Sequence, residues 1–277
     1  MATLCLGTAQ LGSAYGVTNS RGRLGDADLD GIIQMAHVHG IVSIDTAPAY
    51  GNSQTRLAPY CRDLVITTKV KANSHSPMLD QVRASLSQLG VSSVRTLLIH
   101  DWFMLDSTRA AAAAKELSEI RELGLVSEIG VSGYEPADIE RALKEFDRLD
   151  AVQFPASALD SRLNQHSVLA DLKTEGTRIQ ARSVFLQGLL AAECTVALGQ
   201  HADVVRFHAE CREAGISSLE GALAVVRALP WVSEIIVGVT SGQELGEIFC
   251  AWDSPLPEFM NFTASQDLAL IDPRNWA

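Results

Sequence analysis

Short apolar runs rich in β-branched residues alternate with amphipathic segments along almost the whole chain. Eight such runs have the length of a strand that is buried on both faces. They cover residues 2–8, 41–45, 63–70, 94–100, 125–132, 150–156, 177–185 and 233–239. Between the first two runs, apolar residues recur at helical spacing, at Leu29, Ile32, Ile33 and Ala36. A regular alternation of strands and helices indicates parallel strands joined by right-handed crossovers.

Eight strand–helix units in 277 residues match an α/β fold of the closed (β/α)8 barrel type, a TIM barrel, better than two open sheets. No linker or shift in composition divides the chain, so we expect a single domain over residues 1–277. Two segments fall outside the alternation, residues 187–200 after the seventh strand and the tail at residues 254–277. The tail contains Pro255, Pro257 and Pro273. Both segments are expected to cover the mouth of the barrel.

Composition narrows the class of partner. A net charge of −11 leaves no basic surface for nucleic acid or for an anionic membrane. No apolar run approaches the roughly 18 residues that a membrane-spanning helix needs, and the N-terminus lacks the basic region of a signal peptide. The five cysteines form no metal-binding pattern. We therefore expect a cytoplasmic protein with reduced thiols, no metal and a small-molecule partner, and we make no prediction of its oligomeric state.

Polar side chains gather where the predicted strands end. In a barrel, the carboxyl ends of the strands point into one shared mouth, where barrel enzymes place their chemistry. Four of these residues follow the second, third and fourth strands, which are neighbours in the barrel wall. They are Asp45, Tyr50, Lys69 and His100. The sequence thus predicts one cluster of an acid, a phenol, a lysine and a histidine.

This cluster suits the reduction of a carbonyl group. Reduction leaves an oxyanion that needs a proton, but a free tyrosine with a pKa of about 10 is a poor donor at neutral pH. A neighbouring lysine ammonium should lower that pKa, and a carboxylate paired with the lysine should hold the ammonium in place. We therefore assign Tyr50 as general acid, Lys69 as the group that tunes it and Asp45 as the anchor of Lys69. His100 would donate a hydrogen bond to the substrate oxygen as negative charge develops. A Schiff base on Lys69, as in lysine-dependent aldolases, is the chemical alternative.

The chain also resembles the aldo-keto reductases over residues 4–253. The matching motifs are D-T-A-P-A-Y-G (45–51), T-T-K-V (67–70), L-L-I-H (97–100), G-V-S (130–132), V-Q-F (152–154) and R-S-V-F-L-Q-G-L-L (182–190). The family's catalytic tetrad has these four residue types in this chain order. The resemblance implies reduction of an aldehyde or ketone with NADP or NAD as cofactor. Since some members of the family bind the cofactor chiefly to regulate a partner, a non-catalytic sensing subunit is a second alternative.

No G-x-G-x-x-G motif opens a βαβ unit, so a Rossmann domain is not indicated. The resemblance instead implies a dinucleotide laid across the barrel mouth. Gly7, Thr8, Ser132 and Gln153 would lie at its nicotinamide, with Ser132 and Gln153 holding the carboxamide. Ser183, Leu186, Gln187 and Gly188 would lie at the pyrophosphate. The adenosine end would meet Val239, Thr240, Ser241, Glu244 and Glu247.

Three departures from the family pattern affect the cofactor site. Gly133 stands where the family often has asparagine, and Arg182 stands where many members stack an aromatic ring on the nicotinamide. Arg182 could stack in the same way or turn toward a phosphate or carboxylate. Gly238 and Glu244 occupy places where many members hold the 2′-phosphate of NADPH with a cation. We therefore expect comparable use of NADH and NADPH.

Aromatic residues in the loops after the first, fourth and seventh strands are candidates for the substrate pocket. They are Tyr15, Trp102, Phe103 and Phe185. Aromatic walls bind apolar faces, including those of sugars. The run L-G-S-A-Y-G-V-T-N at residues 11–19 resembles a variant found near bacterial sugar metabolism. A sugar-like carbonyl compound is therefore one expectation for the substrate.

Overall fold

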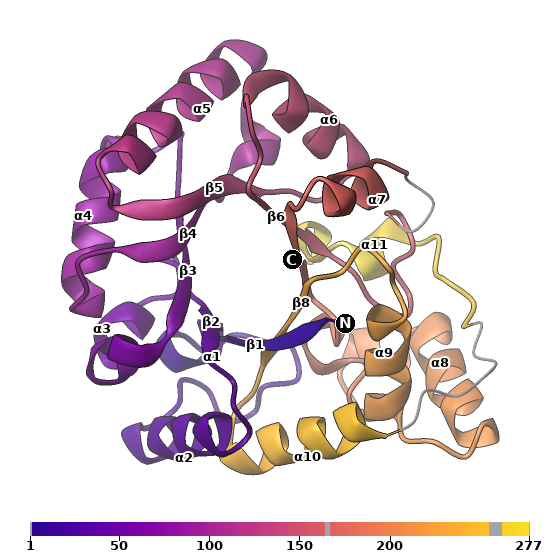
Figure 1. Ribbon diagram of the computed structural model, residues 1–277. Helices are drawn as coiled ribbons and strands as arrows, with labels where there is room; N and C mark the ends of the chain where they lie inside the picture. The colour runs from indigo at the N-terminus through magenta and orange to yellow at the C-terminus, as the bar shows by residue number, and fades with distance from the viewer. Residues whose placement is uncertain (1, 164–166, 255–261, 277) are drawn as a thin grey trace.

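Eight parallel strands form a closed barrel in the computed structural model, which describes residues 2–163, 167–254 and 262–276 (Figure 1). The strands follow one another around the barrel in chain order, and the first pairs with the eighth. They are β1 (Thr3–Gly7), β2 (Ser43–Asp45), β3 (Val65–Val70), β4 (Val94–Ile99), β5 (Val126–Ser132), β6 (Ala151–Pro155), β7 (Arg178–Arg182) and β8 (Glu234–Gly238). The predicted (β/α)8 barrel is confirmed.

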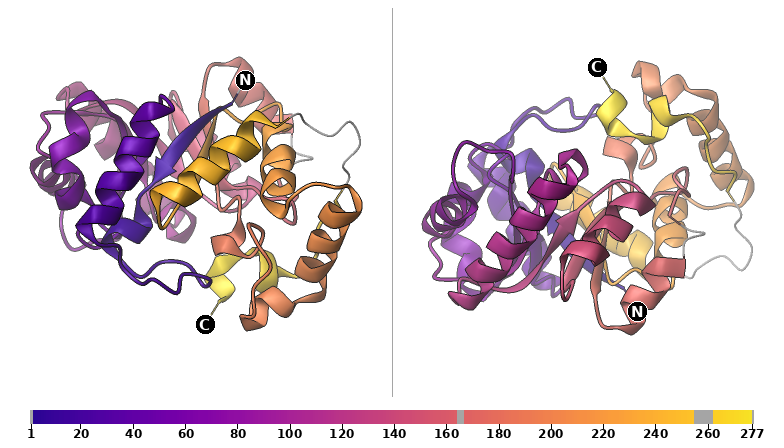
Figure 2. Two further views of the ribbon diagram at one scale, coloured as in Figure 1. Left: turned by 90° about the horizontal axis from the view of Figure 1, so that it is seen from below. Right: turned by 90° about the horizontal axis from the view of Figure 1, so that it is seen from above.

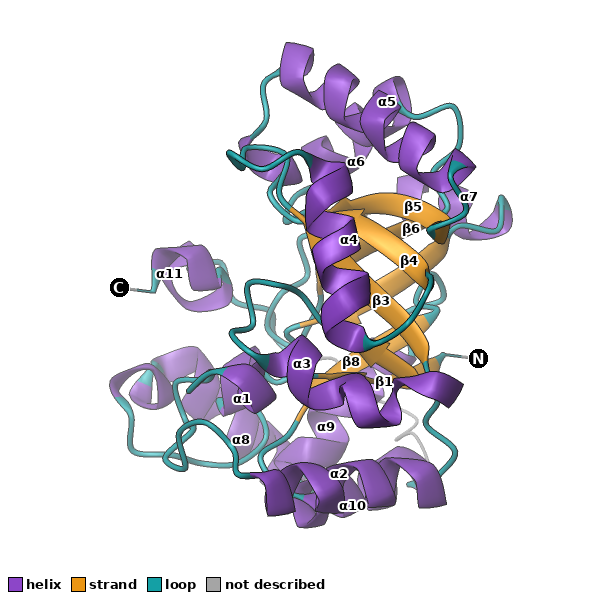
Figure 3. Cartoon of the chain, turned by 90° about the vertical axis from the view of Figure 1, so that its left-hand side faces the viewer, coloured by secondary structure: helices purple, strands orange, loops and turns teal. Residues whose placement is uncertain are grey.

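Helices surround the barrel on its outer side (Figure 3). The α-helices are α1 (Ala9–Gly12), α2 (Asp26–Val38), α3 (Ser53–Leu57), α4 (Met78–Leu89), α5 (Ser107–Glu122), α6 (Pro136–Glu145), α7 (Ser167–Thr174), α8 (Ala202–Glu213), α9 (Ser218–Arg227), α10 (Gly242–Asp253) and α11 (Leu268–Ile271). Short 3-10 helices are η1 (Ala58–Asp63), η2 (Trp102–Met104), η3 (Leu186–Gly188), η4 (Ala197–Gln200) and η5 (Pro273–Asn275). None of the helices in the described ranges is both long and apolar enough to cross a membrane.

The apolar core lies between the strands and the helices. Along β2, Ile44 is 1% exposed and belongs to this core, whereas its neighbours Ser43 and Asp45 make their polar contacts inside the barrel. Because successive side chains of a strand point to opposite faces, this alternation separates an apolar shell from a polar interior. The strand ends that carry chemistry are thus anchored from outside by helix packing.

Each predicted strand is longer than the observed one, and the seventh and the second show why. The seventh run was expected to continue to residue 185, but β7 ends at Arg182 because Ser183 adopts a positive φ of 60°. The second run was expected to begin at residue 41, yet Ile41 still donates its N–H to the Ala36 carbonyl of α2 at 2.9 Å. In both places a local turn replaces the expected strand pairing.

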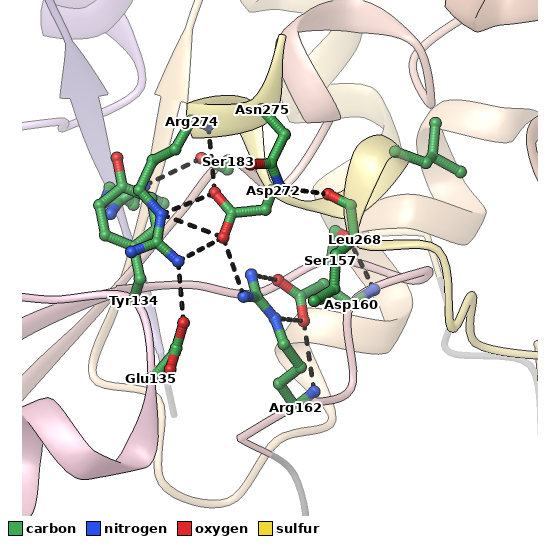
Figure 4. Close-up of polar contacts among 12 residues, drawn as sticks. Tyr134, Glu135, Ser157, Asp160, Arg162, Ser183, Leu268, Asp272, Arg274 and Asn275 are labelled. Carbon is green, nitrogen blue, oxygen red and sulfur yellow. Dashed lines mark hydrogen bonds and ion pairs between the residues drawn. The ribbon is translucent and has the colours of Figure 1, made fainter.

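The C-terminal tail carries α11 and η5 and lies at the end of the barrel opposite to the N-terminus (Figure 2). Asp272 holds it there. Its carboxylate accepts a hydrogen bond from Arg162 at 3.2 Å and another from Nε of Arg274 at 2.9 Å (Figure 4). Arg274 also donates to Glu135 at 2.9 Å, and its guanidinium carbon lies 4.1 Å from the ring centre of Tyr134. The tail therefore closes against the rim of the barrel mouth. Pro255 and Pro257 lie outside the described residues.

Candidate active site

A cavity of about 1010 Å³ opens at the carboxyl ends of the strands. Asp45, Tyr50 and His100 line one part of it, and Thr240 and Glu244 line another. The lining also includes most of the residues predicted at the mouth, namely Gly7, Thr8, Tyr15, Phe103, Ser132, Gln153, Arg182, Ser183, Phe185, Gln187, Gly188, Val239 and Glu247. One continuous cavity thus connects three of the four predicted catalytic residues with the end of β8, and Lys69 lies behind its wall in contact with Tyr50.

The acid, the lysine and the phenol form a hydrogen-bonded chain. The Nζ atom of Lys69 lies 2.6 and 2.8 Å from the two carboxylate oxygens of Asp45 and donates to the Tyr50 hydroxyl at 3.1 Å. It also donates to the Thr46 carbonyl at 3.2 Å. Lys69 and Asp45 are only 1% and 3% exposed, so water does not screen this ion pair. The rings of Tyr50 and His100 stand at 89° with their centres 6.3 Å apart.

Tyr50 reaches the mouth from a loop that is fixed by two glycines. A Cβ atom on Gly12 would lie 1.6 Å from the Tyr50 carbonyl oxygen, and one on Gly51 would lie 2.3 Å from the Gly12 carbonyl oxygen. Gly51 also has a φ of 62°, which favours glycine. The backbone of this loop therefore packs directly on α1. Asp45 and Lys69 need no such device, because both belong to strands.

The pKa of Tyr50 is raised above its usual value. Burial disfavours the phenolate, and the Lys69 ammonium offsets this effect only in part. Our expectation of a lowered pKa is wrong for the protein alone, since it considered the charge of Lys69 without the desolvation of Tyr50. For Lys69, burial by itself would lower the pKa, but the charge of Asp45 and the contact with Tyr50 raise it. The pair is therefore a neutral phenol beside a charged ammonium.

His100 is a neutral imidazole. Burial, together with the positive charges of Lys69, Arg182 and Lys71, lowers its pKa from 6.5 to about 3. A neutral imidazole has one N–H donor and one acceptor nitrogen. It can therefore donate a hydrogen bond in the cavity without adding a positive charge beside Lys69.

Arg182 turns toward β5 and the residues after it. Its guanidinium carbon lies 4.2 Å from the ring centre of Tyr134, and Nη2 donates to the Gly133 carbonyl at 3.0 Å. Among the described residues it forms no ion pair with a carboxylate. Gly133 cannot carry a side chain without movement, because a Cβ atom there would lie 2.5 Å from Cε1 of Phe154. The guanidinium of Arg182 thus lies beside Gly133, where the packing of Phe154 leaves no room for a side chain.

A bridge joins the loop after β1 to the loop after β7. Val17 N–H donates to Oε1 of Gln187 at 3.2 Å, and the Thr18 hydroxyl donates to the Gln187 carbonyl at 2.9 Å. The second loop is strained, because Ser183, Leu186 and Gln187 are non-glycine residues with φ values of 60°, 43° and 54°. Thr18 and Gln187 both line the cavity, so this bridge forms part of its wall.

Glu244 engages the end of β8 at the far part of the cavity. Its carboxylate accepts from the Thr240 N–H at 2.6 Å and from the Thr240 hydroxyl at 2.5 Å. Arg21 contacts the same turn, donating to the Thr240 carbonyl at 2.9 Å while it pairs with Asp28 at 2.5 Å. The sequence analysis missed Arg21. The pairing of β1 with β8 could have indicated that the loop after β1 meets the turn after β8.

Comparison with known proteins identifies the family. The family model for the aldo/keto reductase family matches residues 3–261. The chain belongs to the aldo/keto reductase family. It is 32% identical over 121 residues to an aldo-keto reductase of Mycolicibacterium vanbaalenii, a match covering 41% of this chain and 43% of that protein. It is 29% identical over 179 residues to an uncharacterized oxidoreductase of Bacillus subtilis, covering 59% of this chain and 61% of that one. These matches thus span less than two thirds of the relatives' own lengths.

Solved structures of the family share the fold. The aldo-keto reductase from Bacillus halodurans in its holo form has a TM-score of 0.74 at 15% identity, covering 95% of this chain and 94% of that one. A glycerol dehydrogenase from Gluconobacter oxydans has a TM-score of 0.70 at 19% identity, covering 92% and 88%. At these identities the likeness concerns the barrel alone.

Besides Lys69, three predicted site residues do not line the cavity of this family member. Trp102 is fully buried in the apolar core, where its indole N–H donates to the Asp138 carbonyl at 2.9 Å. Its assignment to the substrate pocket is wrong, because η2 turns its side chain inward. Leu186 is also buried in the core, and Ser241 caps α10 by accepting from the Glu244 N–H at 3.1 Å. Tyr134 lines the cavity and was missed, although it follows the G-V-S motif at the end of β5.

Proposed function

We propose that the protein is an NADPH- or NADH-dependent oxidoreductase that reduces an aldehyde or ketone to an alcohol. The observation that carries this proposal is the contact of a buried, ion-paired Lys69 ammonium with the Tyr50 hydroxyl at 3.1 Å. A phenol held in this way lies at the wall of a cavity large enough for a dinucleotide and a small carbonyl compound. Membership of the aldo/keto reductase family supports the same reaction.

The lining of the cavity fits a nicotinamide dinucleotide. Gln153 lines it, and no described residue donates to its carbonyl oxygen, so this oxygen is available to a carboxamide N–H. Ser132 would hold the same group, and Gln187 and Gly188 would hold the pyrophosphate. Thr240, Glu244 and Glu247 would meet the adenosine. When bound, the cofactor supplies a hydride to the carbonyl carbon.

The protein's own groups handle the oxygen of the substrate. Because the pKa of Tyr50 is raised, its hydroxyl is protonated at neutral pH and can transfer that proton to the oxygen. Lys69 lies beside the phenolate that results and stabilises its charge, and Asp45 keeps Lys69 in position. Neutral His100 donates a hydrogen bond to the same oxygen as negative charge develops on it.

We further propose comparable affinity for NADH and NADPH. Glu244 already occupies the hydroxyl and N–H of Thr240, which would otherwise be donors for a 2′-phosphate. Arg21 offers a cation nearby, but Asp28 offsets its charge. A sugar-like substrate fits the aromatic lining of Tyr15, Phe103 and Phe185.

Two other functions make different demands on Lys69. A Schiff-base aldolase needs a neutral amine, whereas here the pKa of Lys69 is raised and the amine is ion-paired. A subunit that only senses the cofactor needs no reacting tetrad.

A panel of aldehydes, ketones and open-chain sugars, scored by loss of NADPH or NADH absorbance, tests the proposal. Turnover abolished by Tyr50→Phe supports it, and cofactor binding without turnover of any compound supports the sensing function.

A further inference from the structure

A column of buried polar side chains runs through the barrel interior beneath Asp45. The Nε2 atom of Gln153 donates to Asp45 at 2.7 Å and to Oε1 of Gln180 at 3.0 Å. The Nε2 atom of Gln180 donates in turn to Glu234 at 2.8 Å and to the Thr67 hydroxyl at 3.1 Å. All five residues are at most 5% exposed. The catalytic carboxylate is therefore connected to a second carboxylate deeper in the barrel.

Glu234 is fixed at the deep end of the column. It accepts from Arg178 at 3.2 Å and from the Ser43 hydroxyl at 3.0 Å. Arg178 is itself held by two hydrogen bonds to Glu128, both of 3.0 Å. Because a buried carboxylate is costly unless paired, the ion pair with Arg178 and the hydrogen bond from Ser43 hold Glu234 in place.

The two carboxylates determine the direction of every hydrogen bond between them. An ionised carboxylate can only accept, so Gln180 must turn its NH2 group toward Glu234 and its carbonyl toward Gln153. Gln153 must then turn its NH2 group toward Gln180, and that same group also meets Asp45. If either amide were reversed, two acceptors would face each other in a buried site.

We propose that Gln180 is a positioning residue for the reaction. It does not line the cavity, and it acts by fixing the orientation of the Gln153 amide. That orientation gives Asp45 a donor and leaves the Gln153 carbonyl oxygen free in the cavity. This inference rests on the proposed function, in which that oxygen accepts a hydrogen bond from the nicotinamide carboxamide.

The experiment compares the binding of two dinucleotides by wild-type protein and variants. NAD has a carboxamide NH2 group, and its 3-acetylpyridine analogue has a methyl group in that place. A single neutral hydrogen bond corresponds to about a tenfold preference for NAD. Replacement by Gln180→Leu removes one of the two acceptors of the Gln153 NH2 group, so that Asp45 alone holds the amide and its carbonyl oxygen is less firmly placed. We expect the preference to fall to about twofold or less, measured as the ratio of Kd values from protein fluorescence.

Gln54→Leu is the matched control. Gln54 is also a fully buried glutamine, and its Nε2 atom donates to Thr68 at 2.8 Å on the outer side of the barrel wall. It should retain the wild-type preference despite the same loss of a buried amide. If Gln180→Leu does not fold, as judged by its melting curve, Gln180→Met gives a longer apolar side chain for the same test.

The outcomes separate the inference from the proposed function. A preference lost in the Leu or Met variant and kept in the control supports the role of Gln180. An unchanged preference in a folded Leu or Met variant overturns it, and so does a wild-type protein that binds NAD and its analogue equally. A wild-type protein that binds no nicotinamide dinucleotide at all rejects the proposed function and this inference with it.

Discussion

The imidazole of His100 stands almost perpendicular to the ring of Tyr50, at 89° and with 6.3 Å between the ring centres. Both groups face the same cavity, yet burial shifts their pKa values in opposite directions, upward for Tyr50 and downward for His100. Burial keeps the phenol protonated and the imidazole neutral. In the proposed function, Tyr50 is thus the donor for proton transfer and His100 the donor for hydrogen bonding.

The first prediction concerns the pH dependence of turnover. The pKa of His100 is about 3 and that of Tyr50 lies above 10.0, so neither group changes its charge between about pH 5 and 8. We expect kcat to be flat over this range and to fall only at alkaline pH, where Tyr50 loses its proton. A profile of kcat against pH measures this. A step near pH 6.5 that disappears in His100→Asn would show that the imidazole titrates.

His100 also predicts a pH dependence of stability. Its pKa is 6.5 in the unfolded chain and about 3 in the native protein. Between these values the unfolded chain binds a proton that the native protein does not, so this residue lowers the free energy of unfolding as pH falls from about 6.5 to 3. We expect His100→Gln to lose less stability than the wild type over that range, as measured by melting temperature against pH. Equal slopes for both proteins would contradict the burial of a neutral imidazole.

Replacement of the general acid should separate chemistry from binding. We expect Tyr50→Phe to lower kcat by at least about 10²-fold, the usual weight of general acid catalysis, because the proton donor is lost. Cofactor Kd should stay within about twofold, since the ring remains in place. Tyr60→Phe is the control, because Tyr60 lies on the outside and contacts Asp30. Near wild-type turnover by Tyr50→Phe would remove Tyr50 from the mechanism.

Lys69 should not form a covalent bond with carbonyl substrates. Its ammonium is paired with Asp45 and its pKa is raised, so a neutral nucleophilic amine is scarce. We expect borohydride treatment in the presence of an aldehyde substrate to leave Lys69 unmodified in peptide mass spectra. Lys71, which is exposed and lines the cavity, serves as the internal reference for non-specific labelling. A substrate-dependent adduct confined to Lys69 would favour the aldolase alternative.

Cofactor preference should follow the charge at position 244. Glu244→Arg replaces an anion with a cation beside Thr240 and so adds a partner for a 2′-phosphate. We expect the ratio of NADH Kd to NADPH Kd to rise about ten- to a hundred-fold, the contribution of one charge-assisted contact. Asp253→Arg makes the same change of charge at the other end of α10. Two results would count against this account: a wild-type preference for NADPH above about a hundred-fold, or an equal shift in the control.

Local sequence signals were sufficient to predict the strands and the cluster of polar residues at their ends. An apolar run followed by a polar residue defines where a barrel strand ends, and this placed Asp45, Lys69 and His100 together. Features that depend on side-chain packing could not be predicted in this way. Trp102 was expected in the pocket because it follows β4, but its side chain turns into the core. The direction of the Tyr50 pKa shift depends on a balance between burial and charge, which the sequence does not contain.

Contacts between segments that are distant in the chain could not be predicted from the sequence either. Arg21 meets Thr240 only because β1 and β8 are adjacent in the closed barrel, although 219 positions separate the two residues in the chain. Tyr134 becomes part of the mouth through its stacking with Arg182 and Arg274. Neither relationship leaves a periodic pattern in the sequence, so both required the assembled barrel.

The separation of an apolar shell from a polar interior divides the chain into two sets of positions with different tolerance to change. Truncation of outward residues such as Ile44 and Leu97 removes buried apolar area and lowers the free energy of unfolding. In a cell, this loss of stability reduces the abundance of the protein. Inward residues such as Gln180 contribute orientation more than apolar burial, so their replacement should leave abundant protein with altered kinetics. A library of single variants scored for both abundance and turnover would show these two classes alternating residue by residue along each strand.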